Sequence, residues 1–194
     1  MSFFLKQRWI QINLGIMTMV WLSCSFDYYL IGFQLKYFPG NIYVNTFVSS
    51  GSEMIAYGLA GIFYNRLGAK ISLFGSFVIA LLGGFAILIN GALVGWDNAG
   101  YAFPIFVLFA KFGIASSFNI VYVCNIDVFP TLFQATSFGI VNFGARLASV
   151  FAPQVAELNE PWPMLSFVTT AIIAAFLVIF LRPKAVEGIV TPPR

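Results

Sequence analysis

The stretch Lys111–Pro153, KFGIASSFNIVYVCNIDVFPTLFQATSFGIVNFGARLASVFAP, decides the fold class of this chain. It contains two apolar segments of helical length joined by a short polar turn, Asn125–Gln134, and each segment carries one cation, Lys111 or Arg146. A cation inside an apolar span costs several kcal/mol unless it faces a cavity or a partner. These two cations are therefore the first functional candidates.

The composition of the whole chain indicates an integral, multi-pass membrane protein of the all-α class. Of its 194 residues, 60% are hydrophobic and 9% are charged, and the mean hydropathy is +0.89. Soluble domains have about 25% charged residues. The net charge of +3 comes from dispersed cations, so we predict no nucleic-acid partner. The chain has no histidine, and Cys24 and Cys124 lie in apolar segments, so we predict no metal site, no cofactor and no disulfide.

Breaks that are rich in Gly, Pro, Asn and Asp divide the chain into six predicted transmembrane helices. Each predicted span has about 19–24 residues, which is enough to cross about 30 Å of hydrocarbon. Residues 1–194 are therefore predicted to form a single six-helix transmembrane domain. Its spans are residues 10–33, 43–64, 71–93, 101–124, 135–157 and 163–181.

The distribution of cations predicts how this bundle is oriented. If both termini lie on one side of the membrane, Lys36 is the only cation in the loops of the other side. By the positive-inside rule, the termini face the cytoplasm, or the matrix in a mitochondrion. The unpaired cysteines and the lack of Asn-x-Ser/Thr sites are compatible with the mitochondrial inner membrane. The cations on the side of the termini are Lys6, Arg8, Arg66, Lys70, Arg182, Lys184 and Arg194.

Several short motifs occur in the order found in one family of carriers. The loop NRLGAK follows the second predicted span, DVFPT precedes the fifth, and ARLAS lies within the fifth. The chain resembles the carboxyl-terminal six-helix half of the organic ion transporters (cation, anion and carnitine carriers) of the major facilitator superfamily. The resemblance covers nearly the whole chain. The further matching residues are Asp27–Tyr29, Gly40–Asn45, Lys111, Ala115–Asn119, Ala152–Pro153 and Ala156–Leu158.

This resemblance implies a substrate site. The aromatic residues matching Tyr28, Tyr29 and Phe118 face the substrate cavity in anion-type members, and the arginine matching Arg146 holds an organic anion. Tyr57 stands where anion carriers place a cation in the second span. A guanidinium in a low-dielectric cleft with aromatic walls suits a carboxylate on a flat apolar body.

The resemblance also implies a charge network that gates the carrier at the loop ends. Its members here are Arg66, Lys70 and Asp127. Two positions depart from the family, because Asn65 replaces an acid and Gln134 replaces an arginine. We therefore expect the network to be partial.

For each intramembrane charge, a structural role stands beside the functional one. Arg146 either holds a substrate or bonds to helix-end carbonyls or to an acid such as Glu53. Lys111 either lines the cavity or pairs with a neighbouring helix while its ammonium group reaches toward the interface. Asp27 and Glu53 either form a proton or cation site or have pairing roles. The tyrosines, Tyr122 among them, either recognise a ligand or pack.

The motifs of the sequence also limit the classes of function that the chain can have. The chain has no glycine-rich nucleotide loop, no Ser-His-Asp set and no metal-ligand spacing, so we predict that it is not an enzyme. The resembling carriers work by rocking one six-helix half against another. We therefore predict first a transporter-derived half that serves as a non-catalytic accessory subunit of a larger membrane complex, with lipids and other membrane subunits as partners. A partner is also expected to hold the tail, Gly188–Arg194, in an ordered position.

Two alternatives stay open. In the first, the chain is a functional half of an organic anion or zwitterion transporter, which works after pairing with a complementary six-helix half. In the second, it is a fragment of a full-length carrier. The initial methionine, followed by a plausible first span, favours a natural half over a fragment.

Overall fold

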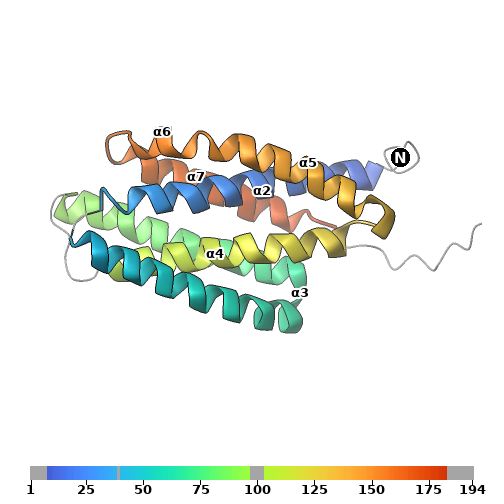
Figure 1. The fold of residues 1–194 in the computed structure, drawn as a ribbon, viewed down its shortest axis with the longest axis horizontal. Helices are drawn as coiled ribbons and strands as arrows, with labels where there is room; N and C mark the ends of the chain where they lie inside the picture. The colour runs from blue at the N-terminus through green and yellow to red at the C-terminus, as the bar shows by residue number, and fades with distance from the viewer. Residues whose placement is uncertain (1–7, 39, 97–102, 183–194) are drawn as a thin grey trace, which may run out of the picture.

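A computed structural model describes residues 8–38, 40–96 and 103–182, and this part of the chain is helical without strands (Figure 1). The all-α prediction is therefore confirmed. The tail at Gly188–Arg194, Lys6 and Lys184 lie outside the described residues. The helices are α2 (Arg8–Gln34), α3 (Ile42–Val94), α4 (Phe103–Val128), α5 (Thr131–Ser149), α6 (Ala152–Ala156) and α7 (Trp162–Ile179).

Helix α3 has 53 residues and consists of two arms that meet at Gly68. There the backbone adopts φ 80° and ψ 164°, a conformation that glycine tolerates because it has no Cβ. Figure 1 shows the two arms lying antiparallel, the first in cyan and the second in green. The predicted break over Asn65–Lys70 was too wide, because the flanking residues are helical and only Gly68 departs from helical angles.

The turn between α4 and α5 is also shorter than predicted. Helix α4 continues to Val128, so Asp127 lies in its last turn, and α5 begins one residue after Pro130. The side-chain amide of Gln134 donates to the carbonyl of Ile126 at 2.7 Å and to that of Phe129 at 3.1 Å. It thereby satisfies carbonyls that a helix end leaves without an intrahelical partner.

The predicted single span 135–157 was wrong as one helix. Helix α5 ends at Ser149, and the short helix α6 begins at Ala152. Pro153 explains the interruption, because it has no N–H to donate to the carbonyl of Ser149. The sequence carried this signal, since a proline inside a helical pattern ends or kinks the helix.

The bundle core is built from large buried side chains and from close approach of small residues. Trp21, Phe77 and Phe167 are fully buried. A Cβ added to Gly83 on α3 would lie 2.2 Å from the backbone nitrogen of Ala110 on α4. Small residues at helix interfaces let backbones approach closely, which is how helices gain packing in a membrane.

The described ends of the chain lie at one end of the bundle. The side chain of Asn13 donates to the carbonyl of Arg182 at 2.9 Å and accepts from its N–H at 3.2 Å, which joins the start of α2 to the end of α7. Lys70 donates to the carbonyl of Ile179 at 2.5 Å, so the Gly68 kink lies at this end as well.

Membrane character is evident from the helices themselves. Within the described residues, four helices are long and apolar enough to cross a membrane: α2, α3, α4 and α7. Cys24 and Cys124 are both buried and unpaired. The chain is thus a helical membrane bundle.

Candidate functional site

Tyr28 on α2 joins three helices through its ring and its hydroxyl. The hydroxyl donates to the carboxylate of Glu53 on the first arm of α3. The ammonium group of Lys111 on α4 lies 3.8 Å from the centroid of the Tyr28 ring. Phe118, also on α4, stacks on the same ring with 5.0 Å between centroids and 25° between planes. A charged, aromatic centre therefore lies where α2, α3 and α4 meet.

Glu53 and Lys111 supply opposite charges to this centre. The carboxylate of Glu53 accepts a second hydrogen bond, from the hydroxyl of Tyr57 at 2.8 Å, and it acts electrostatically on Lys111. Lys111 is only 4% exposed, and the face of an aromatic ring stabilises such a desolvated cation. Of the two roles considered for Lys111, the structure shows contact with a neighbouring helix inside the bundle.

Arg146 brings α5 to the same centre. Its guanidinium donates to the hydroxyl of Tyr29 at 3.2 Å, and the Tyr29 ring is perpendicular to that of Tyr28 with 5.5 Å between centroids. Arg146 is exposed on the surface of the bundle, and within the described residues it forms no ion pair with Glu53. Its guanidinium therefore keeps donors that can hold an anion.

The structure thus brings all five predicted substrate residues into one cluster, together with Glu53 and Lys111. This Tyr28 cluster has one carboxylate, two cations and aromatic walls, and it holds no nucleophile–base pair of the kind that covalent chemistry needs. Binding by these residues stays a prediction. The cluster consists of Tyr28, Tyr29, Glu53, Tyr57, Lys111, Phe118 and Arg146.

Asp27 lies apart from this cluster. It is fully buried, and its Oδ1 accepts from the hydroxyl of Thr170 on α7 at 2.5 Å. Asp27 and Glu53 therefore have different partners, and Oδ2 of Asp27 is buried without a hydrogen-bond partner among the described residues. The roles of both acids stay predictions. In the part of the chain that the structure describes, no group of three His, Cys, Asp or Glu residues could hold a metal ion.

The predicted charge network is not formed as ion pairs. Asp127 accepts from the hydroxyl of Tyr64, and Lys70 donates to the end of α7. Arg66 is exposed and makes no ion pair within residues 8–38, 40–96 and 103–182. Lys70 and Asp127 do line one cavity of about 310 Å³ beside Gly68.

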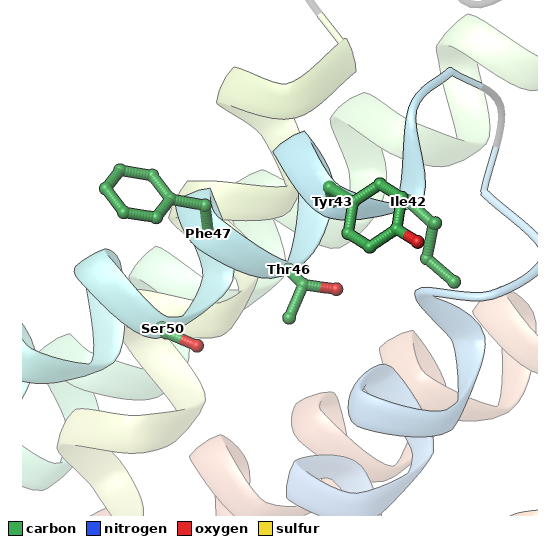
Figure 2. Close-up of a pocket in the computed structure, with 5 residues that line it drawn as sticks. All are labelled: Ile42, Tyr43, Thr46, Phe47 and Ser50. Atoms are coloured by element: carbon green, nitrogen blue, oxygen red, sulfur yellow. The ribbon is translucent and has the colours of Figure 1, made fainter.

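The first turns of α3 carry a shallow apolar hollow of about 540 Å³ that sequence reasoning missed (Figure 2). Tyr43 and Phe47 are each 82% exposed there. Helical spacing continues this face from Phe47 through Ser50 to Tyr57 of the Tyr28 cluster. The spacing of the two aromatic residues, four positions apart, was the available signal. The lining residues are Ile42, Tyr43, Thr46, Phe47 and Ser50.

Comparisons with known proteins give the chain its relatives. No protein-family model matches the chain. Solute carrier family 22 member 21 of Mus musculus is 30% identical over 175 residues, which cover 84% of this chain. The human organic cation/carnitine transporter 2 is 28% identical over 166 residues and also covers 84%. The chain is a homologue of the solute carrier family 22 transporters. Solute carrier family 22 member 6 of Bos taurus is 30% identical over 170 residues, which cover 87% of this chain.

These solute carrier family 22 relatives confirm the resemblance to organic ion transporters. They are carriers and not enzymes, which confirms the non-enzymatic prediction. The chain spans about 30% of the length of each of these relatives. Their names specify no organelle, so the mitochondrial inner membrane stays a prediction.

Proposed function

We propose that the chain forms one half of an organic ion carrier, with the Tyr28 cluster as its side of the substrate pathway. The observation that carries the proposal is the cluster itself, where four helices bring together two cations, one acid and several aromatic rings. Arg146 is exposed on the bundle, and an exposed guanidinium facing lipid tails is costly. A complementary six-helix half that encloses a water-filled cavity gives this face a polar environment.

The topology that fits this proposal has six membrane crossings. They are α2, the two arms of α3, α4, α5 with α6, and α7. Arg66, Lys70 and Arg182 are grouped toward the end where Asn13 meets Arg182, whereas Lys36 at the opposite end is paired with Glu157 at 3.8 Å. The positive-inside tendency then places the described chain ends on the cytoplasmic or matrix side.

The substrate class that fits the cluster is an organic anion or zwitterion. Arg146 offers a planar fork of donors that matches a carboxylate. Glu53, flanked by Tyr28 and Tyr57, suits a cationic group at the other end of a substrate, because aromatic faces and a carboxylate both attract cations. Carnitine, which the name of one relative includes, has both groups.

Uptake measurements test the proposal. The chain is purified with the membrane proteins that accompany it and is reconstituted in liposomes, and uptake of labelled carnitine and of an aromatic carboxylate is measured. We expect Arg146→Ala to reduce uptake at least about tenfold, since a charge-assisted hydrogen bond contributes roughly 1.5–3 kcal/mol. Lys36→Ala, which removes an exposed cation at the bundle end, serves as the matched control. Equal uptake by wild type and Arg146→Ala contradicts the proposal.

A second candidate function is the accessory subunit of a larger membrane complex. It is favoured by the incomplete charge network, in which Tyr64 holds Asp127 and Arg66 has no ion pair among the described residues. In this case the Tyr28 cluster packs against another subunit or lipid. The outcome that separates the two functions is loss of the complex on removal of the chain, without any flux that depends on Arg146.

A further inference from the structure

A buried amide–carboxyl contact joins the end of α2 to the turn before α7. Gln34 is the last residue of α2 and is 1% exposed. Its Nε2 donates to Oε1 of Glu160 at 2.6 Å, across 126 residues of sequence. Glu160 lies between α6 and α7, outside the membrane-spanning helices.

The second oxygen of each side chain is what makes this contact unusual. Oε1 of Gln34 and Oε2 of Glu160 are both buried, and neither has a hydrogen-bond partner among the described residues. An amide oxygen and an ionised carboxylate oxygen can only accept, so they cannot satisfy each other. A proton on Oε2 changes this, because the carboxyl group then has an O–H to donate.

We propose that Glu160 is a proton-binding site whose protonated form bonds doubly to Gln34 and fastens the end of α2 to the turn before α7. In this form Gln34 Nε2 donates to Glu160 Oε1, and Glu160 Oε2–H donates to Gln34 Oε1. Ionisation removes the second bond and leaves a charge in a partly buried position, which favours separation of the pair. The proposal does not depend on transport activity.

The electrostatics of the site agree with this geometry. Burial raises the pKa of the Glu160 carboxyl from its ordinary 4.5 to about 7. Between the two pKa values, the Glu160 carboxyl is protonated while it is in contact with Gln34 and is ionised when it is exposed to solvent. The contact is therefore strongest below about pH 4.5 and weakens as the pH rises through about 7.

No neighbouring charged group among the described residues accounts for the pH dependence of this contact, so it is assigned to Glu160. On the α2 side the charged group is Lys36, which is exposed and lies over the ring of Tyr37. On the α6 side it is Glu157, which is paired with Lys36. Helix α7 contributes no titratable side chain. Asp97 lies outside the described residues. No cation forms an ion pair with Glu160 in the described part of the chain.

Hydrogen–deuterium exchange of the full chain in lipid nanodiscs tests the proposal. Protection of amides at residues 34–38 is compared at pH 5.5 and pH 8.0, after correction for the intrinsic pH dependence of exchange. We expect protection to fall about tenfold at the higher pH, a value discounted because Glu160 is partly exposed. Glu160→Gln, which stays neutral, should remove the pH dependence. The matched control Glu157→Gln, at an exposed acid three positions earlier, should keep it.

Two results overturn the proposal: wild-type protection that does not change with pH, or Glu160→Gln that changes as wild type does. A direct titration of the wild-type chain tests the proposal even if a variant is unstable. Carboxyl ¹³C NMR of the glutamates in the wild-type chain should show one group titrating near pH 7. It is assigned by its absence in Glu160→Gln or, if that variant does not fold, in Glu160→Asp. A Glu160 signal that titrates near pH 4.5 also overturns the proposal.

Discussion

Replacement of Tyr28 tests the organisation of the candidate site most sharply. Tyr28→Phe removes only the hydroxyl that donates to Glu53, whereas Tyr28→Leu also removes the ring that faces Lys111 and Phe118. If the ring stabilises the buried ammonium of Lys111, the two substitutions must differ in cost. A ring that served only as packing would still lose its stacking on Phe118 in Tyr28→Leu, so the contact with Lys111 has to be separated from that loss.

The expected magnitudes follow from the individual contacts. The hydroxyl bond to a carboxylate contributes roughly 1.5–3 kcal/mol, so Tyr28→Phe should lower the free energy of unfolding by about 2 kcal/mol. A desolvated cation–ring contact contributes about 2 kcal/mol, and a stacked aromatic pair contributes roughly 0.5–1.5 kcal/mol more. Tyr28→Leu should therefore lower the free energy of unfolding by about 4.5–5.5 kcal/mol.

Unfolding in mixed micelles with increasing denaturing detergent, followed by tryptophan fluorescence, measures these costs. A double-mutant cycle of Tyr28→Leu with Lys111→Met isolates the contact between ring and ammonium. We expect a coupling free energy of about 2 kcal/mol. A coupling below about 0.5 kcal/mol, or equal costs for Tyr28→Phe and Tyr28→Leu, refutes the reasoning.

Other predictions concern the elements that position the site. Gly83→Ala should destabilise the bundle by about 1–3 kcal/mol, because the added Cβ meets the α4 backbone. Gly75→Ala is the control, because its added Cβ has no atom outside its own stretch of helix within 4 Å, and it should leave stability unchanged. Thermal unfolding of the two variants compares them. Gly68→Ala should cost about 1–3 kcal/mol through its positive φ, with Gly58→Ala as the helical control in the same unfolding assay. Gln134→Leu should increase hydrogen exchange at the end of α4 several-fold, and unchanged exchange there would speak against its capping role.

Much of the fold could be predicted because apolar runs, and the Gly-, Pro-, Asn- and Asp-rich segments between them, determine helices locally. Long apolar runs must form helices in a membrane, since every backbone group has to be satisfied internally. The existence of the helices was therefore predictable, while their ends were not. Gly68 takes up the whole reversal of α3 in one residue, and Pro153 splits the fifth span, although its position gave a usable signal.

The contacts of the site were less predictable because they join residues distant in sequence. The resemblance to carriers named Tyr28, Phe118 and Arg146, but nothing local indicated that Glu53 would bond to Tyr28. The pairing of Gln34 with Glu160 depends on how α2 ends beside the turn before α7, which only the packed bundle determines. Sequence patterns indicate which faces of helices are buried, and partner choice follows from packing.

The most direct test of the carrier-half proposal identifies what covers the Tyr28 cluster in the native membrane. A photo-crosslinking amino acid is placed at Tyr57 or at Phe143, an exposed residue three positions before Arg146 on α5. The same substitution at Phe176, exposed on α7, is the control for contacts with lipid and bystander proteins. The proposal predicts that Tyr57 and Phe143 both crosslink to a second six-helix membrane half and that Phe176 does not. Crosslinks from Tyr57 and Phe143 only to lipid, or to a subunit of an unrelated complex, would contradict it.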